Sequence, residues 1–520
     1  MEQLRIAPLG IAPDLVPETA PVGVWTLCSN VYPRDGMERA GGIQAVYGAP
    51  LFAPKWLLNT ASTVAPSFWV YGADTGIGGT DGAGSHVDLT PAAGFVGNTG
   101  ANCWTGGNLN GVPVLCNGGI PVWWNGLVAN DFVTLPGWPA NARARAIRPY
   151  KYHLIALAVD PSTGAFNPDL LWWSSAAVPG AVPSAWVPAP ANEAGSAQLS
   201  ATPGAILDGV ALRDAFVIYK EQSCYSMQYV GGANVMQIQP LFTDVGTLAR
   251  NCVAELDGTH VVLTDGDVIL HDGQTAKSIA DSMIRRTFLQ TIDRASIGRC
   301  FVVPGTPASE VWIAFPDPGE TSCTRAAVWD RVRSRWGVRD LTAIKPFHIA
   351  QGRVPVNVAV PLTWAAQTET WSAVAREWGF SGASSSRFSK LAAGAVAGAA
   401  GLYALDQDPD TLGGITRGFV QRNAMDFGNP DTRKIINRVW LSAKGPAGTL
   451  LAVQVGGTMN VGEAPVFGDP VYCTIGGRMD APIFSSGRYL SLRVSDASVD
   501  VKAPWVLTAA TLEYRVGGMF

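Results

Sequence analysis

The stretch "DGDVILHDG" (265–273) holds one complete strand between two tight turns, and it indicates the kind of fold this chain adopts. Asp-Gly pairs favour hairpin turns, because aspartate satisfies nearby backbone groups and glycine accepts a positive φ. Of the five residues between them, the four at 268–271 suffice for a short strand and leave no room for a helix. The stretch therefore predicts β-hairpins joined by short turns.

The same pattern continues on both sides of this stretch. Residues 215–230, 259–274 and 310–319 are β-branched or aromatic runs bounded by Gly, Pro and Asp, which is typical of strands and turns. Charged residues make up 15% of the 520-residue chain, against roughly 25% in an average soluble protein, and it contains 58 glycines and 36 prolines. We expect an all-β protein, with one or two short helices in 273–293 as the exception.

Comparable aromatic or Asp-Gly segments recur about every fifty residues. They are "VWWNG" (122–126), "LLWWSS" (170–175), "CYSMQYVGG" (224–232), "LHDGQ" (270–274), "VWDRVRSRW" (328–336) and, more weakly, "LYALDQD" (402–408). A period of about 40 to 50 residues with four short strands per unit is typical of β-propeller blades. We predict a β-propeller of six to eight blades over 46–415; a set of β-sandwiches is the alternative.

The ends of the chain differ from this central region. In the C-terminal part (416–520), Tyr489, Ser491 and Arg493 alternate with apolar residues, which predicts an antiparallel sheet with one face in solvent. This part is expected to be a small β-domain or a set of ring-closing strands. Residues 1–45 are expected to be an N-terminal arm or a propeller-closing strand.

Motifs that carry chemistry are missing from the sequence, so we predict no enzyme, no catalytic, cofactor or metal site, and no cofactor. No nucleophile elbow, zinc-protease motif or phosphate-binding loop occurs. Histidine and cysteine spacings do not suit metal ligation, so we expect core or turn histidines and buried thiols. "DQDPD" (406–410) resembles a cation-binding loop in composition, but a solvated turn is the favoured interpretation. These histidines and cysteines are His86, His153, His260, His271, His348, Cys28, Cys103, Cys116, Cys224, Cys252, Cys300, Cys323 and Cys473.

Charge and hydropathy exclude further classes of protein. A formal net charge of −4 lacks the basic excess that stable nucleic-acid binding requires. No signal peptide is recognisable at the N-terminus, and no apolar run is long enough to span a membrane. We expect a soluble protein made in a reducing cytoplasm.

The tryptophans in "DLLWWSSAAVPGAVPSAWV" (169–187) have two interpretations. Trp172, Trp173 and Trp186 either fill a sheet-rich core or form a platform on which sugars stack. The 18 tryptophans are spread along the whole chain, whereas a ligand platform would concentrate them, so core packing is favoured.

The segment "VGVWTLCSNVYPRDGMERAGG" (22–42) resembles an N-terminal element of tail nozzle (tail hub) proteins of short-tailed bacteriophages, also called tail tubular protein B or packaged-DNA stabilisation protein. Other stretches are similar to that family in the expected order, among them the run from 170, "DGDVILHDGQTAKSI" and "SGRYLSLRV". Some nozzle proteins are considerably larger, so this chain would be a compact version. The matching positions are Trp25, Asn30, Tyr32, Asp35, Gly36, Arg39 and Gly41.

The resemblance implies a structural virion protein, made in the host cytoplasm, that assembles as a ring, expected to be a hexamer. It would extend the DNA exit channel below the portal and adaptor and help retain the genome until ejection. Its expected partners are further copies of itself, the adaptor, tail fibre or tailspike proteins, and double-stranded DNA in transit. Trp25, Asn30, Asp35 and Gly36 are expected to set turn geometry.

Two other functions stay open on a propeller scaffold. A carbohydrate-binding tail adhesin would expose Trp172, Trp173 and Trp186 to solvent. A glycosidase would need two carboxylates about 5 to 9 Å apart in one pocket.

Overall fold

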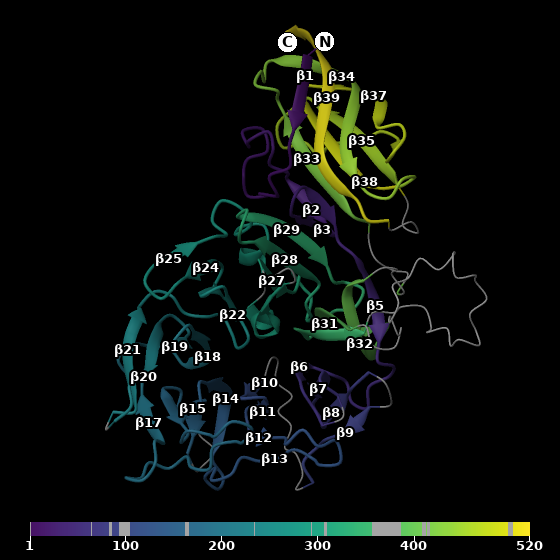
Figure 1. Cartoon of the computed structure of the whole chain (residues 1–520). Coiled ribbons are helices and arrows are strands. Elements are labelled where there is room, and N and C mark those ends of the chain that lie inside the picture. The colour runs from purple at the N-terminus through teal and green to yellow at the C-terminus, as the bar shows by residue number, and fades with distance from the viewer. Residues whose placement is uncertain are drawn as a thin grey trace, which may run out of the picture.

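The fold is nearly all β, as the sequence predicts. The computed structural model describes residues 2–519 except 64, 83–85, 93–103, 162–165, 233, 293, 306–308, 356–385, 408–411, 413–416 and 498–502. The described residues form strands β1 to β39 and two short 3-10 helices. A propeller occupies the lower part of Figure 1 and a β-sandwich the upper part, where both chain ends lie. The predicted fold class, a β-propeller with an additional C-terminal β-rich domain, is confirmed.

The described residues form a propeller of seven blades, each with four antiparallel strands. Blades 1 to 4 comprise β6 (Trp56–Thr60), β7 (Phe68–Gly72), β8 (Ile77–Thr80) and β9 (Val87–Asp88); β10 (Thr105–Leu109), β11 (Val112–Cys116), β12 (Val122–Trp123) and β13 (Val133–Thr134); β14 (Arg143–Tyr150), β15 (His153–Asp160), β16 (Leu170–Trp173) and β17 (Gly195–Gln198); and β18 (Ile206–Leu212), β19 (Ala215–Lys220), β20 (Cys224–Tyr229) and β21 (Met236–Phe242).

Blades 5 to 7 follow in chain order, and an N-terminal strand completes the last of them. They comprise β22 (Val253–Leu256), β23 (Thr259–Leu263), β24 (Val268–His271) and β25 (Ala276–Ser278); β26 (Phe301–Pro304), β27 (Glu310–Phe315), β28 (Arg325–Asp330) and β29 (Arg335–Asp340); and β30 (His348–Pro355), β31 (Ser386–Val396), β32 (Ala399–Gln407) and β5 (Gly42–Val46). β5 pairs antiparallel with β32, and β30 contacts β6 of blade 1. The ring is therefore closed by strands from both ends of the propeller sequence.

The recurring segments of the sequence mark one strand position. All six coincide with the third strand of successive blades: β12, β16, β20, β24, β28 and β32. Blade 1 has no such marker because its third strand, β8, reads "IGGT". Gly78 there lies against the ring of Tyr71 from the neighbouring strand, so that the aromatic group comes from β7 instead.

The β-sandwich packs two sheets over one core and draws strands from both chain ends. One sheet has the order β2 (Leu27–Ser29), β33 (Phe419–Met425), β38 (Tyr489–Asp496), β35 (Leu450–Thr458) and β36 (Val471–Thr474). The other contains β39 (Val506–Met519), β34 (Thr432–Lys444) and β37 (Asp480–Gly487), with β1 (Glu2–Ile6) paired to β39.

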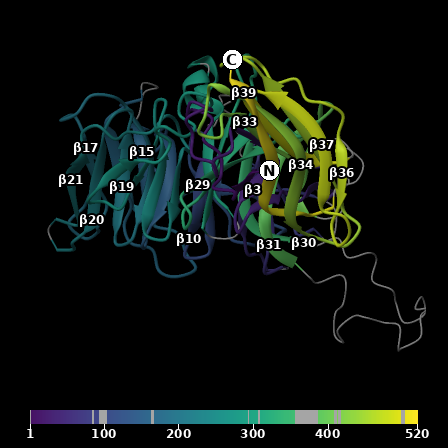
Figure 2. The same cartoon turned by 90° about the horizontal axis from the view of Figure 1, so that it is seen from above.

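A short hairpin joins the sandwich to the propeller. β3 (Val31–Pro33) pairs with β29 of blade 6, and β4 (Met37–Arg39) pairs with β39 of the sandwich. Blade 6 and one sandwich sheet thus form a continuous ten-stranded sheet. Figure 2 shows the sandwich beside this part of the ring.

The expectation of one or two short helices in 273–293 is met by one short 3-10 helix only. The described chain has no α-helix there; β25 takes residues 276–278, and only a 3-10 helix (Leu289–Thr291) falls within the range, with a second (Arg294–Arg299) after it. Ser282 has a φ of 59°, a left-handed conformation that ends a right-handed helix. Met283 and Phe288 pack on the core between blade 6 and the sandwich without helical periodicity.

The predicted half-solvated sheet is found in part, because burial alternates along β34 and β37 but not along β38. Ser491 and Tyr489 of β38 are only 2% and 6% exposed, although alternation places them on the outer face. A bulge in β33 brings the backbone N–H of Ala424 to within 3.1 Å of the Ser491 hydroxyl, which accepts its hydrogen bond. Of the three predicted outward residues only Arg493 is partly exposed, and its guanidinium lies over the rings of Phe419 and Phe467.

Candidate functional site: the joint and the propeller axis

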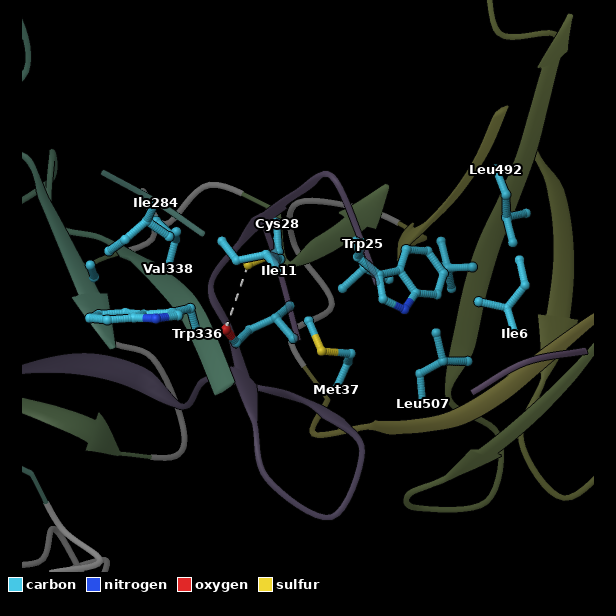
Figure 3. Close-up of a cluster of buried hydrophobic side chains, with 14 of the residues drawn as sticks. Ile6, Ile11, Trp25, Cys28, Met37, Ile284, Trp336, Val338, Leu492 and Leu507 are labelled. Carbon is cyan, nitrogen blue, oxygen red and sulfur yellow. Dashed lines mark hydrogen bonds between the residues drawn. The ribbon is translucent and has the colours of Figure 1, made fainter. Parts of the chain in front are cut away.

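Trp25 lies at the centre of the joint between sandwich and propeller. Figure 3 shows its ring between Ile6, Leu492 and Leu507 on the sandwich side and Trp336 of blade 6 on the other. Trp25 is completely buried within one apolar cluster that spans both parts. Because burying a tryptophan removes on the order of 200 Å² from water, this contact stabilises the joint by several kcal/mol.

A buried ion pair crosses the same joint. Arg39 of β4 donates from Nε to the Asp496 carboxylate of β38 at 3.0 and 3.1 Å, and both side chains are almost fully buried. The backbone N–H of Gly418 and the indole N–H of Trp505 also donate to Asp496, at 2.8 and 2.6 Å. Asp496 therefore accepts hydrogen bonds from three segments far apart in the sequence.

Asn30 connects the N-terminal hairpin to blade 6. It is fully buried with a φ of 53°, which asparagine tolerates better than most residues. Its side-chain oxygen accepts hydrogen bonds from Arg339 Nη1 and from the backbone N–H of Asp340, both at 3.1 Å. Asn30 thus positions the last strand of blade 6 as well as its own turn.

Tyr32 and Asp406 connect the hairpin to blade 7. The Tyr32 hydroxyl donates to Asp406 at 2.6 Å, and Lys390 pairs with the same carboxylate at 2.9 Å while lying over the ring of Trp312. Burial would raise the pKa of Asp406, but Lys390 and Arg339 outweigh it and lower the pKa. Burial and the nearby carboxylate raise the Tyr32 pKa well above its usual value. The hydroxyl stays protonated and acts as a donor.

The turn residues of this motif act differently from the prediction. Asp35 is exposed, and its carboxylate pairs with Arg333 of the β28–β29 turn rather than with the local backbone. Gly36 does not have positive φ; a Cβ there would lie 2.4 Å from the carbonyl oxygen of Leu507, so close packing requires glycine. At Gly41 a Cβ would meet the Asp406 backbone at 2.7 Å. Trp25 is a core residue and not a turn residue.

A network of polar side chains connects the first strands of neighbouring blades. Arg148 of β14 makes two parallel hydrogen bonds to Asp208 of β18, at 2.9 and 2.8 Å, and also donates to the Asn251 side chain and the Gly106 carbonyl. Asn251 donates to Asp208 through its backbone N–H and to the Trp104 carbonyl through its amide. Burial alone would raise the Asp208 pKa, but Arg148 lowers it. This network, which we call the axial plug, links blades 2 to 5.

Chemically, the axial plug is an ion pair whose two side chains are both engaged in hydrogen bonds, rather than a reactive centre. Both oxygens of Asp208 accept hydrogen bonds, and the Arg148 guanidinium donates to side chains and carbonyls of three blades. The lowered pKa of Asp208 keeps its carboxylate ionised near neutral pH. The axial plug is suited to holding neighbouring blades in a fixed orientation relative to one another.

A second buried network lies between blades 4 and 5. The Tyr219 hydroxyl contacts His260 Nδ1 at 2.6 Å and His271 Nε2 at 2.5 Å. His260 Nε2 donates to the Ala211 carbonyl at 2.9 Å, so its Nδ1 accepts the Tyr219 proton, and His271 Nε2–H must donate to the tyrosine oxygen. Burial lowers the pKa of His260 to about 3 and that of His271 to about 4. Both imidazoles are neutral at pH 7.

Replacing Tyr219 with phenylalanine should lower the free energy of unfolding by about 1–3 kcal/mol, since it leaves buried imidazole nitrogens without partners. Tyr152→Phe is the matched control, because Tyr152 is 54% exposed and should change stability by less than about 0.5 kcal/mol. Urea denaturation followed by circular dichroism measures both. Equal stability of the two variants would show that the hydroxyl makes no net contribution.

The tryptophans of 169–187 pack mainly as predicted. Trp186 is 2% exposed and makes an edge contact with Trp138, their centroids 4.7 Å apart. Trp172 is half-buried against the same cluster, and Trp173 donates to the Glu193 carbonyl at 2.9 Å. They do not form an exposed sugar platform.

The remaining predicted positions also lie in the interior. All five histidines occupy core or partly buried positions, and seven cysteines are buried, while Cys103 lies outside the described residues. Burial raises the pKa of thiols such as Cys28 to about 12, which makes them unreactive. No group of three or more His, Cys, Asp or Glu side chains suits a metal ion within the described part of the chain. Of 406–410, Asp406 is a buried ion-pair member and not a solvated turn; 408–410 lie outside the described residues.

Two cavities are notable for the residues that line them. One, of about 770 Å³, lies beside β12 and β13 of blade 2 and is lined by Trp123 and Asp131 among others. The other, of about 370 Å³, includes Asp14 and Asp281. Asp14 accepts from the backbone N–H groups of residues 286 and 287, and Asp281 pairs with Arg285, so these two carboxylates are engaged structurally. In the described residues, no helix is long and apolar enough to cross a membrane.

Sequence reasoning missed Asp208, Asp496, Arg148 and Tyr219. The available signal was a charged residue inside an otherwise apolar strand, as in "ILDGVAL" of β18. Such a residue must be paired when buried, but the sequence alone does not identify its partner.

Comparison with known proteins gives structural likeness only. No family model matches the sequence, and no curated protein sequence matches it. The extracellular domain of the one-component system BT4673 from B. thetaiotaomicron has 7% identity and a TM-score of 0.40 over 90% of this chain and 62% of that one. This chain thus spans less than two thirds of that domain.

Two further structures give similar values. The AfRom2 CNH domain has 10% identity and a TM-score of 0.38, covering 70% of this chain and 99% of that one. The exo-β-1,3-galactanase of Phanerochaete chrysosporium has 8% identity and a TM-score of 0.26, covering 91% and 100%. At TM-scores this low, none of these likenesses informs the function.

Proposed function

We propose that this chain is a structural subunit of a short phage tail, without catalytic activity. Copies of it would form a ring, expected to contain six subunits, that extends the DNA exit channel below the portal and adaptor. The observation that carries the proposal is the resemblance of 22–42, whose residues Trp25, Asn30, Tyr32, Arg39 and Gly41 all lie at the joint between sandwich, blade 6 and blade 7. A motif that fixes the angle between two domains is what a ring-forming subunit requires.

The channel is proposed to lie between subunits rather than through one of them. Arg148, Asp208 and Asn251 tie neighbouring blades of one propeller together with direct hydrogen bonds. DNA in transit would pass through the space that a ring of copies encloses. A net charge of −4 suits this passage, because each Lys or Arg on a phosphate adds affinity and slows release.

The proposed partners follow from this position in the virion. One rim of the ring would contact the adaptor, and the outer surface would contact tail fibre or tailspike proteins. Double-stranded DNA would pass without being held.

Light scattering and negative-stain microscopy of the purified chain, alone and with the tail adaptor, test the proposal. We expect six-fold rings, with a mass six times the 54.8 kDa of one chain, either alone or on the adaptor. A monomer under both conditions would contradict it.

The glycosidase alternative gains no support from the larger cavity. Among the described residues that line it, Asp131 is the one carboxylate, whereas glycoside hydrolysis usually requires two. Simple carbohydrate binding needs no such pair.

A further inference from the structure

The cavity at the edge of blade 2 is large enough for a small ligand. We call it the blade 2 groove; it lies beside β12, β13 and the loop 125–131. Its volume of about 770 Å³ falls within the roughly 300–1,000 Å³ that is usual for ligand pockets. No contact of the joint or of the axial plug involves it.

The loop that forms one wall is held in place by the core. Trp124 is fully buried, and its indole N–H lies within hydrogen-bond distance of the carbonyls of Leu127 and Asn130, at 3.0 and 2.9 Å. The Asn125 side chain accepts from the backbone N–H of Leu127, and Phe132 packs near Trp124 with nearly parallel rings. The wall is therefore formed before any ligand arrives, which lowers the entropic penalty of binding.

The lining combines apolar surface with hydrogen-bonding groups. Trp123 and Val133 face each other across β12 and β13, and Ile120 and Val133 are 45% and 51% exposed. The indole nitrogen of Trp123 is itself buried, so Trp123 contributes apolar ring surface to the lining rather than a hydrogen-bond donor. Asp131 and Thr134 are exposed on the same lining.

We propose that the blade 2 groove binds a neutral saccharide. The C–H face of a pyranose ring packs on aromatic and aliphatic side chains, and its hydroxyls donate to the Asp131 carboxylate and accept from Thr134. The lining contains Asp131 but no Lys or Arg among its described residues, so phosphorylated or acidic sugars would be repelled. Trp172, Trp173 and Trp186 are not among the described residues that line the groove, although Trp123 packs on the same apolar cluster as Trp172 and Trp186, and binding there does not depend on ring assembly.

Calorimetric titration of the full chain with short linear oligosaccharides of glucose, mannose, galactose or N-acetylglucosamine tests the proposal. We expect at least one of them to bind with a dissociation constant of about 1 mM or tighter. The double variant Asp131→Ala, Thr134→Ala should weaken that binding at least tenfold. Both side chains are exposed, so its thermal midpoint should match the wild type.

Two controls complete the test. Tyr152→Ala removes an exposed aromatic ring of blade 3 outside the groove and should leave binding unchanged. Oligogalacturonate, which is acidic, should not bind. The proposal is overturned if no neutral oligosaccharide binds, if the double variant binds as the wild type does, or if Tyr152→Ala abolishes binding.

Discussion

Replacing Asp496 with alanine is expected to lower the free energy of unfolding by about 3–5 kcal/mol, because it leaves a buried charge without its partner. Arg39, which is 4% exposed, would keep its guanidinium in the interior of the joint. The substitution also removes the acceptor of the Gly418 N–H and the Trp505 indole. Unpaired buried donors add to the penalty of the unpaired charge.

Asp35→Ala is the matched control, because it removes another ion pair of the same hairpin. Asp35 pairs with Arg333, but its carboxylate is 89% exposed, and exposed pairs contribute about 0–1 kcal/mol. Guanidinium denaturation, followed by circular dichroism and tryptophan fluorescence, compares the two variants. A loss for Asp496→Ala no larger than that for Asp35→Ala would show that the buried pair does not hold the joint.

Acidification from pH 6.5 to pH 4 is expected to destabilise the protein by up to about 1.4 kcal/mol per pH unit for each neutral buried histidine. Burial lowers the pKa of His260 to about 3, of His271 to about 4 and of His348 to about 3, with Arg148 adding to the effect at His348. In the unfolded chain these groups titrate near 6.5. Between the two values the unfolded state binds more protons, so stability falls as the pH falls.

The pH range in which stability falls distinguishes these histidines from the carboxylates whose pKa values are lowered. The pKa values of Asp208 and Asp406 are lowered in the fold, so their contribution is lost only below about pH 4, where the unfolded chain takes up protons. Burial raises the pKa of Glu310, so this group favours the folded state as the pH falls, opposite to the effect of the histidines.

Thermal unfolding from pH 4 to pH 8 measures this dependence. The double variant His260→Gln, His271→Gln should show a shallower slope than the wild type, whatever its absolute stability. Parallel curves for the two proteins would contradict the assignment of the slope to these imidazoles.

Local sequence signals predicted the repeating part of the fold well. "DGDVILHDG" lies as expected, with β24 between turns at Gly266 and Gly273, both of positive φ. The recurring segments identified the third strands because blades 2 to 7 place an aromatic side chain or a tight turn at an equivalent position. Blade 1 lacks a marker, since glycines of β8 accommodate rings from elsewhere.

Long-range pairing limited the rest of the prediction. The motif at 22–42 was expected to set local turns, yet Asn30 bonds to Arg339, Tyr32 to Asp406 and Arg39 to Asp496. A single sequence shows that such polar residues need partners, but not where the partners lie. Ser491 was likewise assigned to solvent because the bulge in β33 that covers it has no sequence signature.

The pairing of the two chain ends sets the order in which the protein can fold. Glu2 pairs with Tyr514, Cys28 with Val420 and Val46 with Leu402, so β1, β2 and β5 find their partners only after most of the propeller has been synthesised. At about 5–20 residues per second, these strands wait for tens of seconds on the ribosome. Blades 1 to 6 pair locally and can form meanwhile, and until β1, β2 and β5 find their partners these strands are open to mispairing with another chain.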